Sequence, residues 1–246
     1  MDKLLIATGK SRFEKKWKNI EINWFDFVAK LERTTRTRET VVEYSKMKKP
    51  QQDEIKDIGG FVGGHLKDGK RRNGNVVYRT MITLDADFAK SDLWDRLTVI
   101  NDYRCCLYST HKHTPEHPRY RLIIPLDRKV TADEYEAIAR RVAYELGIDQ
   151  FDDTSYQATR LMYWPSTSDD GVYVFEIQDG DLLCADDILA RYPDWTDISF
   201  WPQSSRVTEL HKTAMKKQED PLAKTGTIGA FCRTYPISKA IETFLS

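Results

Sequence analysis

MITLDADF, residues 81–88, is a short apolar and β-branched run that ends in two carboxylates two residues apart. Such a run predicts a β-strand. Side chains alternate between the faces of a strand, so we expect Asp85 and Asp87 to point the same way. Adjacent carboxylates repel each other unless a cation lies between them, and hard oxygen ligands suit Mg²⁺ or Mn²⁺. The pair predicts a metal site; the simpler alternative is a strand that ends in a solvent-exposed acidic loop.

Two further strand-like runs follow, CCLYSTHKH at residues 105–113 and RYRLIIPL at residues 119–126, joined by a Pro-containing loop. This pattern predicts a hairpin with a long connection. The period of two places one hydroxyl and two imidazoles on one face of the first strand, and two guanidiniums on one face of the second. Arginine forks and protonated imidazoles suit a triphosphate. The predicted nucleotide-binding cluster is Ser109, His111, His113, Arg119 and Arg121.

A third acidic element follows a helix-like segment. Thr131 and the acidic residues after it resemble a capped helix start, and helical spacing continues to Gly147. The run IDQFDDTS at residues 148–155 comes next, and a carboxylate from it would complete the metal shell begun by the other two. Alone, this run predicts only a polar turn.

Three segments in this order resemble the three motifs of the archaeo-eukaryotic primase superfamily. They are the Asp-x-Asp pair after a hydrophobic strand, STHKH at residues 109–113, and the hydrophobe-Asp pair of Phe151 and Asp152. The sequences of residues 108–126 and of RLMYWPS at residues 160–166 most resemble those of the primase-polymerase branch found in phages, plasmids and integrated elements. The resemblance covers roughly residues 59–166, with a second patch near the C-terminus.

Two histidines fit the second motif. Ser109-x-His111 matches the family's short pattern, whereas the position of His113 just before Thr-Pro-Glu resembles many phage members and is slightly favoured. Asp149 and Asp153 are neighbouring alternatives to the third carboxylate.

The resemblance implies a mixed α/β fold, in which an RNA-recognition-like antiparallel sheet bears the carboxylates and packs against a smaller α/β unit. This primase-polymerase domain is expected at residues 1–200. A polar linker at 201–224 and the start of a helical module at 225–246 follow it. The sequence stops within that module, which predicts the N-terminal part of a longer primase-helicase.

The implied activity is template-directed nucleotidyl transfer that makes or extends primers on single-stranded DNA, with NTPs or dNTPs as substrates. Two Mg²⁺ or Mn²⁺ ions would activate the attacking hydroxyl and stabilise the leaving pyrophosphate. Cationic side chains would neutralise the developing charge. The implied catalytic residues are Asp85, Asp87, Asp152, His111 and His113, with the three aspartates as metal ligands. The implied nucleotide-binding residues are Ser109, both histidines, Arg119, Arg121 and Arg160.

The composition is that of a globular protein, with 40% hydrophobic and 31% charged residues in 246. No apolar run approaches the roughly 20 residues that span a bilayer, and residues 1–6 are too short an apolar segment for a secretory signal. Four cysteines show neither zinc spacing nor a disulfide framework. These features predict a reducing, cytoplasmic setting in a bacterial or phage-infected cell.

The net charge of zero hides an asymmetry. Residues 1–80 contain 19 Lys and Arg against 11 Asp and Glu, a balance of +8, and the remainder carries the opposite excess. A basic N-terminal third suits a phosphate backbone, although charge runs are often only solvated surface. The candidates for DNA contact are Lys70, Arg71, Arg72 and Lys112.

Two other functions fit parts of the pattern. A rolling-circle initiator nuclease uses paired histidines and a tyrosine nucleophile, but it requires a hydrophobic residue where Lys112 stands between the histidines. A catalytically silent DNA-binding or helicase-loading module would retain the carboxylates as relics. Covalent adducts between a tyrosine and DNA would indicate the nuclease, and absence of metal-dependent nucleotide binding would indicate the silent module.

Overall fold

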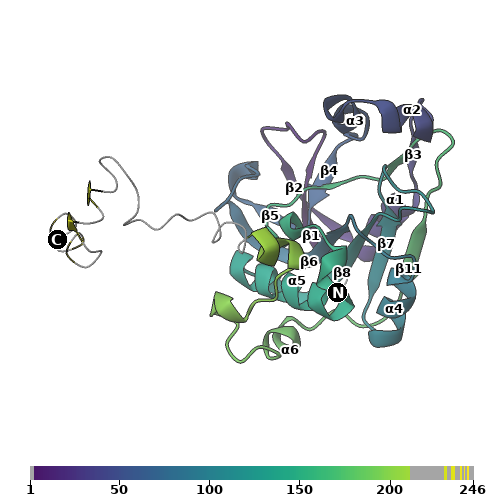
Figure 1. Ribbon diagram of the computed structural model, residues 1–246. Coiled ribbons are helices and arrows are strands. Elements are labelled where there is room, and N and C mark those ends of the chain that lie inside the picture. The colour runs from purple at the N-terminus through teal and green to yellow at the C-terminus, as the bar shows by residue number, and fades with distance from the viewer. Residues whose placement is uncertain are drawn as a thin grey trace. The chain divides into compact units, whose positions relative to one another are not determined.

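The computed structural model describes residues 3–210 and, further on, residues 230, 231, 234, 235, 239, 241 and 243. The chain divides into two compact units, Met1–Pro202 and Gln203–Ser246. The fold and the site described below belong to the first unit (Figure 1). Most of the predicted linker and of the predicted helical module lies outside the described residues.

The strands of the first unit are β1 (Lys3–Gly9), β2 (Lys18–Asn23), β3 (Thr35–Arg36), β4 (Gly60–Val62), β5 (Gly64–Leu66), β6 (Val76–Ala86), β7 (Cys105–Ser109), β8 (Tyr120–Val130), β9 (Met162–Tyr163), β10 (Ser166–Thr167) and β11 (Phe175–Gln178). Its α-helices are α1 (Trp24–Glu32), α2 (Val41–Lys46), α3 (Lys49–Ile55), α4 (Leu93–Ile100), α5 (Ala132–Leu146) and α6 (Ala185–Leu189). Short 3₁₀ turns are η1 (Lys67–Gly69), η2 (Ile148–Gln150), η3 (Asp153–Tyr156) and η4 (Ile198–Phe200).

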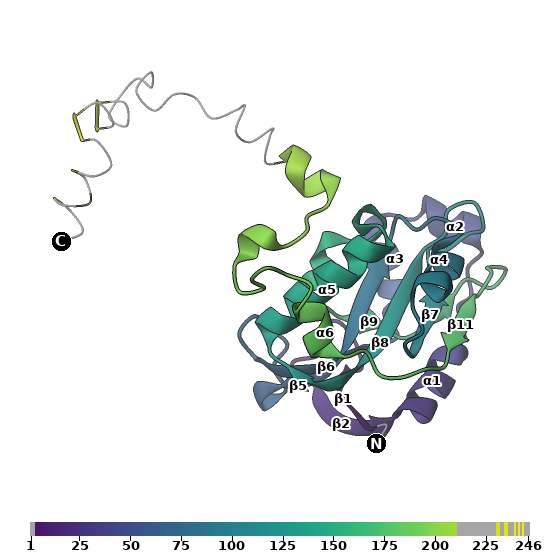
Figure 2. The same ribbon diagram turned by 90° about the horizontal axis from the view of Figure 1, so that it is seen from below.

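The larger sheet has the strand order β11-β7-β8-β6-β5 and is antiparallel throughout. Its two long central strands, β6 and β8, place Asp85 opposite Arg121, and β7 places Tyr108 on the other side of the same arginine. The helices α4, α5 and α6 pack against one face of this sheet around residues such as Ile82 and Leu84 (Figure 2). Because side chains alternate, the opposite face carries Asp85.

The smaller sheet has the order β2-β1-β4-β9 and is also antiparallel. Its inner face, together with α1, packs against the face of the larger sheet that α5 leaves uncovered. Leu4 and Phe61 from the smaller sheet and Phe27 from α1 share one buried cluster with Met81 and Ile123 from the larger sheet. The site residues on the larger sheet therefore face the N-terminal part of the chain.

Local sequence signals explain where the helices begin and end. Thr131 and Glu134 form a capping box at the start of α5, and Gly147 ends that helix at φ 100°, in the left-handed region that favours glycine. Asn23 caps α1 by accepting a hydrogen bond from the backbone N–H of Asp26. These boundaries agree with the sequence patterns.

The predicted mixed α/β class with antiparallel sheets is confirmed. The strand predicted over residues 105–113 is wrong in its second half, because β7 ends at Ser109. Residues 110–113 form a turn instead, in which the N–H of His113 donates to the carbonyl of Thr110 at 2.9 Å. Strand alternation therefore does not govern the two histidines. In the part of the chain that the structure describes, no helix combines the length and apolarity needed to span a bilayer.

Candidate active site

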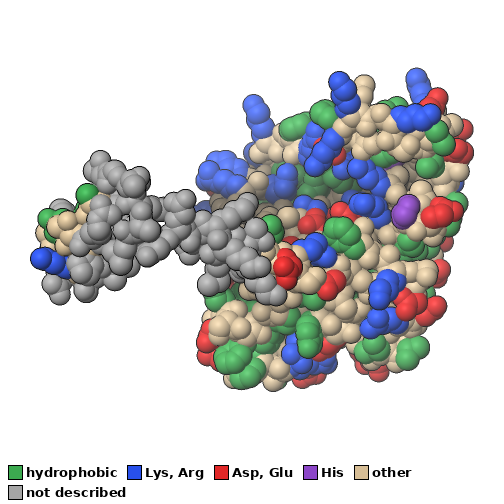
Figure 3. Space-filling view, viewed as in Figure 1, with side chains coloured by type: hydrophobic (Ala, Val, Ile, Leu, Met, Phe, Trp, Pro, Cys, Tyr) green, Lys and Arg blue, Asp and Glu red, His purple; other side chains and the backbone are tan. Residues whose placement is uncertain are grey.

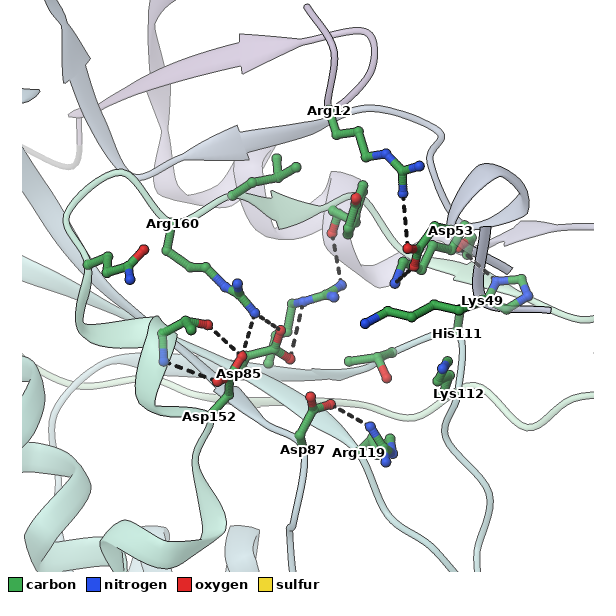
Figure 4. Close-up of a pocket in the computed structure, with 18 of the residues that line it drawn as sticks. Arg12, Lys49, Asp53, Asp85, Asp87, His111, Lys112, Arg119, Asp152 and Arg160 are labelled. Atoms are coloured by element: carbon green, nitrogen blue, oxygen red, sulfur yellow. Dashed lines mark hydrogen bonds and ion pairs between the residues drawn. The ribbon is translucent and has the colours of Figure 1, made fainter. Parts of the chain in front are cut away.

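A pocket of about 640 Å³, called here the central pocket, opens at the end of β6 between the larger sheet and the N-terminal helices. Carboxylates and arginines lie on the sheet side, and cations from α3 and the β1–β2 connection lie across from them (Figure 4). On the molecular surface, Lys and Arg side chains surround a hollow with acidic side chains below it (Figure 3). The pocket is thus a charged cleft lined by distant segments of the chain.

Three carboxylates from two distant segments form the acidic side of the pocket. Asp85 lies at the end of β6 and is 5% exposed, and Asp87 follows one residue beyond the strand. The backbone N–H of Asp152 donates to the carbonyl of Asp85 at 2.8 Å, which joins the third carboxylate to the strand end. The Asp152 side chain also caps η3 by accepting from the N–H of Thr154. The structure therefore brings together the three predicted aspartates.

Three arginines pair with these carboxylates. Arg160 Nη2 lies 2.6 Å from Asp152 Oδ2 and 3.4 Å from Asp85 Oδ2. Two other pairs flank this bridge: Arg119 with Asp87 at 2.8 Å, and the buried Arg121 with Asp85 at 3.6 Å. All three predicted arginines thus line the pocket, where fixed cations compensate the acidic charge.

The carboxylates also influence one another. Burial raises the pKa of Asp87, the negative charge of Asp85 raises it further and that of Asp152 adds to the effect, against the opposing effect of Arg119. A raised pKa under repulsion from two other carboxylates means that added positive charge in the pocket stabilises the ionised form of Asp87.

The donor chemistry of the pocket suits a hard divalent cation, although the side chains as they stand do not form a coordination shell. Asp85 Oδ1 is buried and accepts no hydrogen bond from the residues that the structure describes; its ionic neighbour is an arginine nitrogen 3.6 Å away. Among the described residues, no group of three or more His, Cys, Asp or Glu side chains is arranged to hold a metal ion. Arg119 and Arg160 bind other carboxylate oxygens of this cluster, so a metal ion that used those oxygens would require these ion pairs to open.

The opposite side of the pocket is a basic wall that sequence reasoning mostly missed. Asp53 organises part of it, with Lys56 Nζ at 2.7 Å and Arg12 Nη1 at 3.4 Å. The excess positive charge of residues 1–80 was its signal in the sequence, but that signal did not identify which cations face the site. The basic wall consists of Arg12, Lys49, Lys56, Arg71 and Lys112.

His111 lines the pocket, but both of its ring nitrogens are hydrogen-bonded within the protein. Nε2 lies 3.0 Å from Glu39 Oε1, and Nδ1 lies 2.9 Å from Ser166 Oγ. Burial lowers the pKa of His111, against the opposing effect of Glu39, and the Tyr44 ring packs on the imidazole at 4.4 Å. The structure thus places this histidine in a buried network that links the sheet to α2. The expectation that it offers free donors to a triphosphate is not met in this arrangement.

His113 and Ser109 occupy different surroundings from those expected. Within the described part of the chain, neither lines the central pocket. His113 Nδ1 accepts a hydrogen bond from the backbone N–H of Arg119 at 3.2 Å, which supports the turn that carries this arginine. The Ser109 hydroxyl is fully buried and accepts from the N–H of Val174 at 2.9 Å. The predicted shared face of Ser109 and the histidines is wrong because the strand ends at Ser109.

The remaining predicted residues divide into two groups. Arg71 and Lys112 reach the pocket, whereas Lys70 and Arg72 are exposed side chains that are not among the described residues lining it. Arg71 Nη2 donates to the carbonyl of Arg12 at 3.3 Å. Asp149 and Asp153, the alternatives to Asp152, are likewise absent from the described lining.

Comparison with known proteins identifies the family. Residues 1–204 match the family described as VapE N-terminal domain. The structure is similar to the AEP domain of a cyanophage S-2L primase-polymerase, with a TM-score of 0.42 and 12% identity over 77% of this chain and 88% of that one. It is also similar to the primase RepB′, with a TM-score of 0.38 and 8% identity over 87% of this chain and 62% of that one.

No curated protein matches this chain. The family match covers nearly all of the first unit. The chain therefore belongs to the family of VapE N-terminal domains.

Proposed function

We propose that the chain is a DNA-dependent primase-polymerase of a phage or mobile element, which uses divalent metal ions to transfer nucleotides onto a growing strand on single-stranded DNA. One observation carries this proposal. Asp85, Asp87 and Asp152, from distant parts of the sequence, meet in one pocket with three arginines and face a basic wall. Nucleotidyl transfer requires acidic metal ligands beside positively charged side chains that bind the phosphates.

The three aspartates are the residues that would hold Mg²⁺ or Mn²⁺. Such ions would activate the attacking 3′-hydroxyl and stabilise the pyrophosphate that leaves. Asp85 is the strongest candidate, because its buried Oδ1 accepts no hydrogen bond among the described residues.

The cations of the pocket would bind the phosphates of the nucleotide and strand. Arg119 and Arg160 are partly exposed, with side-chain exposures of 32% and 29%, so a triphosphate can reach their guanidinium groups. Across the pocket, Lys49, Lys56 and Lys112 add charge to the wall that would contact the same phosphates. Arginine forks match phosphate oxygens in pairs, whereas lysines act as point charges.

We assign His111 a supporting role in this function. Its contacts with Glu39 and Ser166 hold the turn that carries Lys112 against the N-terminal helices. His113 supports the backbone of Arg119 from the other end of the same turn. The partners we propose are single-stranded DNA, NTPs or dNTPs, and a helicase region in a longer polypeptide.

The test is incorporation of labelled NTPs and dNTPs on single-stranded templates in Mg²⁺ or Mn²⁺. Wild-type protein should extend or synthesise primers, and the double variant D85N/D87N should lose activity by about 10²-fold or more. The matched control is D92N/D95N, which removes two exposed carboxylates at α4. Retained activity in D85N/D87N would remove this pair from the mechanism. A covalent adduct between protein and DNA would instead indicate a nuclease.

A further inference from the structure

A second hollow, of about 850 Å³, lies between α1 and the connection that joins β1 to β2. It shares none of the lining residues of the central pocket. Basic residues approach it from two sides, three from the β1–β2 region and two from α1 and its end. This basic groove is defined by Lys10, Lys16, Lys18, Lys30 and Arg33.

The described lining of the basic groove carries a clear excess of positive charge. In the part of the chain that the structure describes, no ion pair joins any of its five cations to a carboxylate, whereas Lys56 and Arg12 in the basic wall are both paired with Asp53. Glu14 is the acidic residue in the described lining of the groove. Five exposed cations around one hollow create a positive potential that attracts a polyanion.

The floor of the groove is apolar and partly aromatic. Ile58, Trp164 and Pro165 line it, and the ammonium of Lys30 lies 3.6 Å from the centroid of the Trp164 ring. This cation–π contact holds Lys30 over the floor rather than leaving it free in solvent. The groove therefore combines a cation held in place, an apolar floor and exposed lysines on its rim.

The basic groove and the central pocket have a common dividing wall. Tyr163 at the end of the edge strand β9 lines the pocket, and the next residue, Trp164, lines the groove. The β1–β2 connection contributes in the same way, with Arg12 in the pocket and Lys10 and Glu14 in the groove. A chain bound in the groove would thus lie next to the wall of the pocket.

We propose that the basic groove binds the phosphate backbone of a single-stranded nucleic acid. Proteins that bind single strands without sequence preference follow the phosphate backbone with a positively charged groove, and this groove supplies such charge beside an apolar floor. An acidic peptide would also satisfy the charge. The choice of nucleic acid over peptide rests on the proposed function of the adjacent pocket, which needs such a strand close by.

The test compares two triple charge-reversal variants of the full 246-residue chain. K16E/K18E/R33E alters the basic groove, and K46E/K90E/K129E makes the same change in net charge at exposed positions that line neither hollow. Fluorescence anisotropy with a labelled oligothymidylate measures affinity across a salt series. The groove variant should bind roughly tenfold more weakly, with a slope of log K against log salt about 2 units shallower for three lost phosphate contacts. The control variant should bind close to wild type.

Equal affinities of the two variants for the oligonucleotide would overturn the proposal. The proposal would also be overturned if the groove variant bound the oligonucleotide like wild type but lost binding to a labelled poly-glutamate peptide. That result would assign the surface to an acidic protein partner. Circular dichroism of both variants checks that each is folded. Metal-dependent nucleotide binding, measured by calorimetry, should be unchanged in the groove variant. If wild type binds no nucleotide but the anisotropy difference persists, the proposed function fails and the groove assignment stands.

Discussion

Arg160 donates a 2.6 Å hydrogen bond to the carboxylate of Asp152. The same nitrogen lies 3.4 Å from Asp85, so one guanidinium joins carboxylates that are 67 positions apart in the sequence. Any divalent ion that binds these carboxylates competes with this arginine, and an arginine that is displaced becomes available to an anion such as a triphosphate. The ion pairs of the pocket therefore predict that metal and nucleotide binding reinforce each other.

Replacing Arg160 with Met separates the two roles. Mn²⁺ should bind the variant at least as tightly as wild type in the absence of nucleotide, because a competing cation has been removed. Nucleotide incorporation should nevertheless fall by about 10²-fold, since a charge that stabilises the transferred phosphates is lost. Titration calorimetry and the incorporation assay measure the two effects. Loss of Mn²⁺ binding in R160M would show that the arginine supports the metal site instead of competing for it.

Acidification should destabilise the protein through His111. Burial lowers the pKa of this histidine below its ordinary value of 6.5, against the opposing effect of Glu39. The unfolded chain then takes up a proton near pH 6.5 before the folded chain does, so the contribution to stability is present above that pH and is lost as the pH falls. Urea unfolding of wild type and H111Q between pH 7.5 and about 5.5 measures it. The decline should be shallower in H111Q, and parallel curves would contradict this assignment.

A buried arginine supports the loop that carries Arg160. Arg79 is fully buried and donates to the carbonyl of Ala158 at 2.7 Å and to the hydroxyl of Thr83 at 2.8 Å. The single ammonium group of a lysine cannot reproduce the two hydrogen bonds that this guanidinium makes in different directions. R79K should therefore lower the free energy of unfolding by about 2–4 kcal/mol. Denaturant unfolding checks this value, and R72K, at an exposed position, is the control. If R79K lowers the free energy of unfolding by less than R72K does, the hydrogen bonds of Arg79 are dispensable for stability.

Gly60 allows β4 and β9 to approach each other closely. A Cβ atom at this position would lie 2.3 Å from the carbonyl oxygen of Met162, so G60A should displace β9 and destabilise the fold by about 1–3 kcal/mol. Because Tyr163 follows on the same strand, the change should also weaken nucleotide binding in the pocket. Unfolding and calorimetry test the two effects. If G60A has the same free energy of unfolding as wild type, β4 and β9 can move apart at this position without loss of stability, which would contradict the prediction.

Much of the acidic side of the site was predictable because its signals are local. Asp85 and Asp87 follow a strand whose apolar, β-branched residues mark it plainly, and the hydrophobe-Asp pair at Asp152 follows a helix with clear capping signals at both ends. Arg121 in β8 and Arg119, just before that strand, were also found from residue type and strand alternation. Alternation failed for residues 110–113, because a turn stabilised by a backbone hydrogen bond replaces the strand there.

The rest of the site depends on tertiary contacts that a sequence pattern does not encode. Lys49, Lys56 and Arg12 reach the pocket because α3 and the β1–β2 connection lie across from the end of β6. The buried pairing of His111 with Glu39 joins residues 72 positions apart, and no local pattern signals it. Ser109 matched the motif, yet its hydroxyl is used by the N–H of Val174 on a neighbouring segment.

The most direct measurement of the central claim is calorimetric titration of nucleotide into the full chain, with and without Mn²⁺. Wild type and the D92N/D95N control should bind nucleotide in a Mn²⁺-dependent manner. D85N/D87N should show no metal-dependent binding, because amides replace two of the three carboxylates that are proposed to hold the ion. Equal, metal-dependent binding by D85N/D87N and wild type would contradict the account, as would the absence of nucleotide binding in wild type.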